Sequence, residues 1–249
     1  MKILAVETAT AWLSVAIVDG ATVLARADED AAGAHARKLV PAIDRLLHAC
    51  GLTLSDLDGL AVSIGPGSFT GLRVGLATML GFRAVTGLPL AAVPTLEALA
   101  RNVRDTDRPI CPIIKARAGE VYWAEYQWQG AVLQPLGDER VGSLAQMAQS
   151  FSRPMIVVGP GWLECRAELT RSFKAEVSYL TQAPHEVMRP SAVAVAQAGL
   201  ERLQRGEAAG VGIAPRYVQR SQAEVVRARG EAVPPPVNKG RRARRRVPA

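Results

Sequence analysis

The change of residue period near the start of the chain restricts the fold more than any other feature of the sequence. Residues 3–7 form a short apolar run, and residues 13–18 alternate in the period of a β-strand. Asp19-Gly20 is a strong hairpin signal, and residues 22–25 return as a third strand. From residue 35 onward the apolar side chains fall at helical spacing instead. The sequence therefore predicts an antiparallel three-stranded meander followed by a helix.

The next sixty residues alternate between helix and strand. A helix is predicted over residues 35–50, and Pro41 within it predicts a kink or a later start. A strand at 60–64, a helix at 72–80, a strand at 90–93 and a short helix from Thr95 follow. Strands joined by right-handed helical crossovers lie parallel in one sheet, so we expect a mixed sheet of the α/β class flanked by helices.

The polar segment 105–109 ends in Pro109 and is the predicted domain boundary. A chain of 249 residues can form two small domains, so a first lobe is predicted at 1–105 and a smaller α/β lobe at 106–230. In the second lobe, strands are expected at 110–114, 121–128 and 155–158, and helices at 143–150, 162–173 and 191–205. The helix at 191–205 is a candidate to pack back on the first lobe.

The positive charge is concentrated in residues 231–249. The whole chain carries 30 basic and 23 acidic residues, a net charge of +7, and this tail contributes six basic residues and one acid, or +5. Its Pro-Pro-Pro run and lack of helical period predict disorder. A basic tail on a nearly neutral body suggests RNA contact, and the alternative is a solubility tail. The candidate contact residues are Lys239, Arg241, Arg242, Arg244, Arg245 and Arg246.

Several classes of protein are disfavoured by composition. No apolar run reaches the roughly 18 residues that a membrane span needs, so no membrane association is expected. The first apolar run ends at Glu7, which is unlike a signal peptide. Three scattered cysteines argue against a disulfide framework and favour a cytoplasmic location.

A glycine-rich loop, residues 65–71, joins a predicted strand to a predicted helix. Free N–H groups at a helix start attract anions, so the loop is a candidate phosphate site. It lacks the lysine of a Walker loop, and a turn capped by Ser68 that serves packing alone is the alternative. Hydroxyls that follow Glu7 could add to a weak site. Its candidate residues are Thr8, Thr10, Gly65, Gly67 and Ser68.

Neither a catalytic metal nor a nucleophile is indicated. His35 begins a helix, but Leu39 at i+4 cannot be a second ligand. His48 and His185 have no ligand-like neighbours, and Cys50 lies on an apolar helix face. We therefore predict no intrinsic metal and no catalytic residue.

Small residues on the helix after the glycine loop suggest close helix–helix contact. An interior glycine costs roughly 1 kcal/mol relative to Ala, so Gly75 is expected to have a packing reason. We predict a contact with a partner helix, and internal core packing is the alternative. The candidate interface residues are Leu39, Ile43, Leu46, Leu47, Gly71, Leu72, Gly75, Leu76, Thr78 and Met79.

Several segments together resemble the TsaB (YeaZ) family of tRNA threonylcarbamoyladenosine biosynthesis proteins. They are ILAVETAT at 3–10, HARKLVP at 35–41, SIGPGSFTGLR at 63–73, KARAGEVYW at 115–123 and PRYV at 215–218. The resemblance covers roughly residues 1–220 and is most specific around the glycine loop. Glu7 departs from the aspartate that is usual there. The implied fold is that of the actin, hexokinase and Hsp70 (ASKHA) type, with two RNase H-like lobes.

The resemblance also implies a function. The chain would be a non-catalytic scaffold and activator of the complex that places threonylcarbamoyl on adenosine 37 of tRNAs reading codons that begin with A. Its partners would be a TsaD-like catalytic paralogue, which pairs through the helical layer, and a TsaE-like ATPase. ATP and metal would belong to those subunits, tRNA would bind the complex, and a homodimer could form when the chain is alone. The alternative is a weak nucleotide-binding ATPase or a glycoprotease-like enzyme.

Overall fold

The structure is a computed structural model that describes residues 1–117, 119–210 and 212–216. The predicted RNA-contact residues, from Lys239 to Arg246, lie outside the described residues. None of the described helices is long and apolar enough to cross a membrane.

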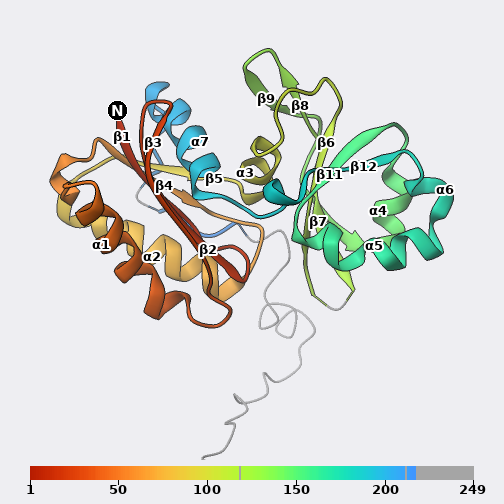
Figure 1. The fold of residues 1–249 in the computed structure, drawn as a ribbon, viewed down its shortest axis with the longest axis horizontal. Helices are drawn as coiled ribbons and strands as arrows, with labels where there is room; N and C mark the ends of the chain where they lie inside the picture. Colours follow the sequence, from red (N-terminus) through yellow and green to blue (C-terminus); the bar gives the residue numbers. More distant parts are fainter. Residues whose placement is uncertain (118, 211, 217–249) are drawn as a thin grey trace, which may run out of the picture. The chain divides into compact units, whose positions relative to one another are not determined.

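The first sheet has five strands in the order β3-β2-β1-β4-β5 (Figure 1). The strands are β1 (Lys2–Glu7), β2 (Trp12–Asp19), β3 (Thr22–Asp30), β4 (Gly59–Ser63) and β5 (Leu90–Val93). β1, β2 and β3 form the predicted antiparallel meander, with Lys2 opposite Asp19. β4 and β5 join in parallel, as the helical crossovers predicted. The predicted antiparallel meander and the parallel strands joined by helical crossovers are both confirmed in this lobe.

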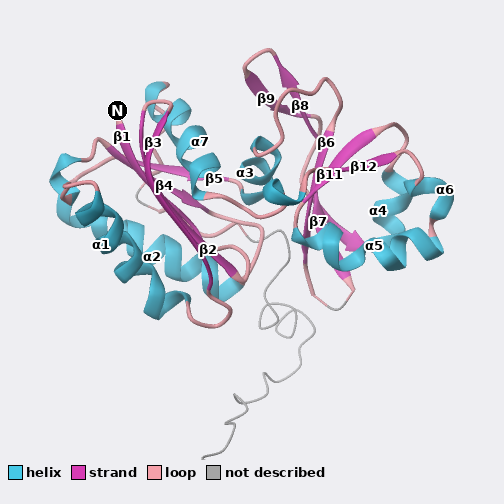
Figure 2. Cartoon of the chain, viewed as in Figure 1, coloured by secondary structure: helices cyan, strands magenta, loops and turns pink. Residues whose placement is uncertain are grey.

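Helices cover both faces of the first sheet, as Figure 2 shows. The two helices on one face are α1 (His35–Ala49) and α2 (Phe69–Thr86), and α7 (Ala192–Gln204) lies on the other. Because side chains alternate along a strand, Leu4 and Val6 of β1 join the α1–α2 core, whereas Ile3 and Ala5 pack in the α7 core. Helix α7 therefore packs on the first sheet. α1 begins at His35 and continues through Pro41.

The second sheet has the path β10-β7-β6-β11-β12, with the hairpin β8–β9 beside β6. Its strands are β6 (Ile110–Lys115), β7 (Glu120–Trp123), β8 (Tyr126–Gln129), β9 (Val132–Pro135), β10 (Arg140–Ser143), β11 (Met155–Val158) and β12 (Leu180–Gln182). Helices α3 (Thr95–Arg101), α4 (Leu144–Ser150), α5 (Pro160–Ser172) and α6 (Lys174–Val177) and the short 3₁₀ helices η1 (Leu54–Asp56) and η2 (His185–Val187) complete the fold.

The predicted single strand at 121–128 is wrong. The chain breaks at Ala124 and Glu125, so β7 pairs with β10 and with the end of β6, while β8 pairs with β9 and with Ile110. Both residues at the break are buried, and Glu125 forms an ion pair with Arg153 at 2.7 Å. The physical reason for the break is that one apolar run serves two different strand partners.

The core clusters do not divide at residue 105. α3 precedes that boundary, yet Leu96, Leu99 and Ala100 pack in the second core, with β6 and β11. The division of the chain into lobes at 105 thus stays a prediction. Helix α3 comes from the first half of the sequence but packs in the second core, and α7 comes from the second half but packs in the first core.

The predicted interface side chains require a correction. The leucines and isoleucine of α1, together with Gly71, Leu72, Gly75, Leu76 and Met79 of α2, are all buried within this chain. Thr78 alone among the ten is half-buried. The apolar stripe of each helix is needed to cover its own sheet, so these side chains are core and do not form an accessible surface. The alternative of internal core packing is the one that the structure supports.

Candidate functional site

The glycine loop packs against the end of β1. The N–H of Ser68 donates to the carbonyl of Ala9 at 2.6 Å, and the N–H of Gly65 donates to the Thr95 hydroxyl at 3.2 Å. The Ser68 hydroxyl accepts from the N–H of Gly71 at 3.2 Å and caps α2. These donors are therefore used inside the protein, and a phosphate could not take them without breaking these bonds.

The small residues of the loop and helix permit this close approach. A Cβ on Gly67 would lie 2.3 Å from the Ala9 carbonyl oxygen, and one on Gly71 would lie 2.1 Å from the Thr8 carbonyl oxygen. A Cβ on Gly75 would lie 2.3 Å from the Thr8 hydroxyl oxygen. The expected packing reason for Gly75 is therefore present inside the chain, in Thr8, the residue that follows β1.

Two of the predicted phosphate-site residues do line an open cavity. Thr10 and Ser68 border a space of about 390 Å³, which His35 and Thr70 also line. The Nε2 atom of the buried His35 has no hydrogen-bond partner among the described residues. Thr8, Gly65 and Gly67 do not line this cavity, so the predicted set divides into a packed group and an accessible pair.

Glu7 is the most perturbed carboxyl group of this region. Complete burial raises the pKa of Glu7 from 4.5 to about 7, and the Ala9 N–H bond and the nearby Ser63 hydroxyl oppose this in part. The Ala9 N–H donates to Oε1 at 2.5 Å, while Oε2 has no partner in the described part of the chain. The protonation state of this carboxyl group therefore changes near neutral pH.

In the described part of the chain, no group of three His, Cys, Asp or Glu side chains is placed to hold a metal ion. The position four residues after His35 holds Leu39, which is fully buried in the core. The expectation of no intrinsic metal stays a prediction.

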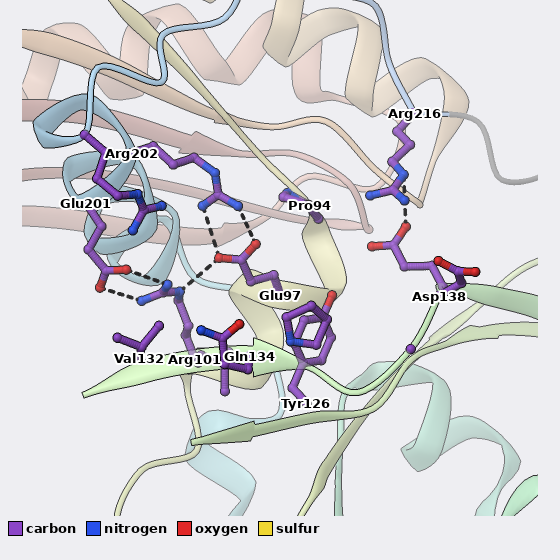
Figure 3. Close-up of a pocket in the computed structure, with 15 residues that line it drawn as sticks. Pro94, Glu97, Arg101, Tyr126, Val132, Gln134, Asp138, Glu201, Arg202 and Arg216 are labelled. Atoms are coloured by element: carbon purple, nitrogen blue, oxygen red, sulfur yellow. Dashed lines mark hydrogen bonds and ion pairs between the residues drawn. The ribbon is translucent and has the colours of Figure 1, made fainter. Parts of the chain in front are cut away.

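A second candidate site lies where α3, α7 and the β8–β9 hairpin meet (Figure 3). This pocket has a volume of about 400 Å³. At one side, Arg101 of α3 binds Glu97 at 3.2 Å and both oxygens of Glu201 at 2.7 and 2.8 Å. Arg202 of α7 binds Glu97 at 2.5 and 3.1 Å. Two arginines and two glutamates thus join α3, from the second core, to α7, from the first.

The other side of the pocket contains an incompletely paired acid. The side chain of Glu139 is 5% exposed, and its only ion pair among the described residues is with Arg216, at 3.3 Å. Neither carboxylate oxygen has a hydrogen bond of good geometry there. Burial raises the pKa of Glu139, and Arg216 opposes this in part. The N–H of Arg216 donates to the Ile64 carbonyl at 2.6 Å, so this residue connects the glycine loop with the second lobe.

Most of the contacts that form this pocket have no local signal in the sequence. Glu97 and Arg101 are four residues apart on α3, a local spacing that favours an ion pair, but nothing local in the sequence brings Arg202 to them. Glu139 lies in an irregular connection without periodic signal. Of the described lining residues, none is a Ser, Cys, His or Lys that could act as a nucleophile. The arrangement can hold the two cores together and bind polar groups.

Comparisons with known proteins agree with the resemblance. The family model described as "TsaD: tRNA N6-adenosine threonylcarbamoyltransferase" matches residues 27–226. The tRNA threonylcarbamoyladenosine biosynthesis protein TsaB of Escherichia coli is 37% identical over 175 residues, which span 65% of this chain and 72% of that protein. TsaB of Bacillus subtilis is 31% identical over 228 residues, which span 90% and 96%.

The solved structures point to the same family and fold. YeaZ from Pseudomonas aeruginosa superposes with a TM-score of 0.70 and 27% identity, covering 87% of this chain and 99% of that one. The ethanolamine utilization protein EutJ from Carboxydothermus hydrogenoformans, at 13% identity and a TM-score of 0.50, shares the fold alone. The fold is therefore the predicted ASKHA type, with two sheets flanked by helices. The chain belongs to the TsaB (YeaZ) family of tRNA threonylcarbamoyladenosine biosynthesis proteins.

Proposed function

We propose that this chain is a non-catalytic scaffold and activator of the complex that places threonylcarbamoyl on adenosine 37 of tRNAs reading codons that begin with A. Its direct partner is a TsaD-like catalytic paralogue, and a TsaE-like ATPase joins the complex. ATP and metal belong to these subunits, and the chain has no cofactor of its own. Family membership supports the pathway.

The surface for the partner is the outer face of α1 and α2, and not the core side chains first expected. Val40 on α1 is 50% exposed and Val85 on α2 is 86% exposed. Ala77 and Gly81 continue the exposed row on α2 at helical spacing. Thr78, the half-buried member of the predicted set, lies beside this row.

One observation carries this proposal. Gly81 is in the interior of α2, and a Cβ built on it would meet nothing within 4 Å. An interior glycine costs roughly 1 kcal/mol relative to Ala, and no contact inside the described chain explains it. Close approach of a partner helix would explain it. The same patch on a second copy would form the homodimer of the isolated chain.

Reconstitution of tRNA modification tests the proposal. The TsaD-like and TsaE-like proteins of the same cell are incubated with tRNA, ATP and the other substrates, with and without this chain. We expect modified adenosine only when the chain is present, and none from the chain alone. Modification that proceeds equally without the chain would refute the activator function, and modification by the purified chain alone would refute the absence of catalysis.

The alternative, a weak nucleotide-binding enzyme, rests on the cavity that Thr10 and Ser68 line. The internal bonds of the glycine loop argue against it. Isothermal titration of the isolated chain with ATP separates the two readings, because the scaffold proposal predicts no saturable heat.

A further inference from the structure

A cationic groove lies beside the α3–α7 pocket, with which it shares Arg101. It has a volume of about 420 Å³, and the start of β2, β3, the end of α3 and the chain leading into α7 all contribute to it. Its lining includes Trp12, Arg26, Arg104 and Arg189. The acids that face it are Asp28, which lies 3.7 Å from Arg26, and Glu186.

Two arginines of this groove are stacked on tryptophans. The guanidinium of Arg189 lies 3.8 Å from the ring centre of Trp12, and that of Arg104 lies 4.2 Å from the ring centre of Trp128. Both arginines are exposed. Within the described residues neither forms an ion pair, whereas Arg101, which also lines the groove, is paired with two glutamates. The groove thus has two guanidinium groups whose charge no carboxylate neutralises at contact distance.

Hydrogen bonds hold in place the segments and side chains that form the two arginine–tryptophan stacks. The amide of Asn102 donates to the carbonyls of Val187 and Arg189 at 3.1 and 2.8 Å, which holds the segment that carries Arg189. The indole N–H of Trp128 donates to the Val103 carbonyl at 2.8 Å, and Arg104 donates to Gln197 at 2.9 Å. Side chains held in this way lose little rotamer freedom when a ligand binds.

The chemistry of a stacked arginine suits a nucleic acid. Its N–H edge matches the geometry of a phosphate, while its exposed plane can receive an unstacked base. Burial lowers the pKa of Arg104 and the nearby Arg101 lowers it further, while Glu201 and Asp105 oppose this in part. A bound anion would offset the repulsion between the two guanidinium groups.

We propose that this groove is an RNA-contact surface, in which Arg104 and Arg189 bind backbone phosphates and the two stacks receive unpaired bases. The proposal rests on the proposed function for the choice of tRNA as the RNA. It assigns to the folded body a contact that the sequence placed only in the basic tail.

Fluorescence anisotropy with a labelled tRNA anticodon stem-loop tests the groove. The full chain is compared with the double variant Arg104→Gln/Arg189→Gln, each in a background whose six basic residues from Lys239 to Arg246 are replaced by Gln. Each phosphate contact to a single strand contributes about 0.7 to the slope of log affinity against log salt. We expect the double variant to bind about tenfold more weakly at physiological salt and its slope to fall by about 1.4.

The matched control is Arg37→Gln/Arg171→Gln, which removes the same charge from exposed helix positions outside the groove. The proposal is overturned if the control loses as much affinity as the groove variant, or if the groove variant binds like its parent. It is also overturned if free AMP competes as well as RNA, because the groove would then be a mononucleotide site. The groove variant should still bind the TsaD-like partner, so loss of RNA binding and failure of the scaffold function are separate results.

Discussion

At the scale of single residues, the buried Glu7 makes folding stability depend on pH. Its pKa of about 7 in the folded state exceeds its ordinary value of 4.5. Between pH 4.5 and pH 7, Glu7 is therefore protonated in the folded chain and ionised in the unfolded chain. The contribution of Glu7 is therefore fully present below pH 4.5 and is lost as the pH rises through 7. The difference amounts to about 3 kcal/mol at most.

We predict that Glu7→Gln removes this dependence and is more stable than the wild type at pH 8. Urea unfolding at pH 5 and at pH 8 measures it, with the exposed Glu168→Gln as control, which should keep the wild-type profile. A stability difference between Glu7→Gln and the wild type that is the same at both pH values would contradict the assignment.

The contact between Gly75 and Thr8 gives a second prediction at this scale. Gly75→Ala places a Cβ where the Thr8 hydroxyl lies, so it should destabilise the fold by about 1–3 kcal/mol. Thr8→Ala removes that oxygen, which has no described hydrogen-bond partner, and should restore most of the loss in the double variant. Thermal unfolding of the four proteins forms a double-mutant cycle. Additive losses would show that the two residues do not meet.

At the scale of helices and strands, α2 has one face for its own sheet and another for a partner. We predict that Gly81→Arg leaves the fold intact and weakens binding to the TsaD-like partner by at least about 1–3 kcal/mol, the usual loss on overpacking a tight contact. Ala167→Arg on the exposed face of α5 is the control. Titration calorimetry measures the affinity, and unchanged binding by a folded Gly81→Arg variant would place the interface elsewhere.

The elements also show what the sequence could and could not predict. The Asp19-Gly20 turn and the helical spacing after His35 are local signals, and they predicted the antiparallel meander and the helix that follows it. The sequence could not show which glycine of α2 faces the interior. Helical spacing places both Gly75 and Gly81 on the helix, but only the fold brings Gly75 against Thr8 and leaves Gly81 exposed. The break at Ala124 was missed because an apolar run does not reveal two separate strand partners. The pocket around Glu97 depends on tertiary contacts between residues about a hundred positions apart.

At the scale of the whole molecule, the two cores are joined by the paired charges of α3 and α7. Glu97 is 9% exposed and pairs with both Arg101 and Arg202. Glu97→Ala would leave Arg202 without its ion pair and Arg101 with Glu201 alone, in a largely buried setting, so we predict a loss of about 3–5 kcal/mol. Glu207→Ala, which removes an exposed pair with Arg205, should change stability far less. Urea midpoints of the two variants decide this, and equal effects would contradict a structural role for the α3–α7 network.

We propose that this chain acts as one subunit of a larger assembly. The most direct test is the molar mass, by light scattering after size exclusion, of the full chain mixed with the TsaD-like protein of the same cell. We predict a species that contains both proteins, at a mass above that of either one alone, and its loss with Gly81→Arg. Two separate peaks at the masses of the individual proteins, at concentrations where both are folded, would contradict the account.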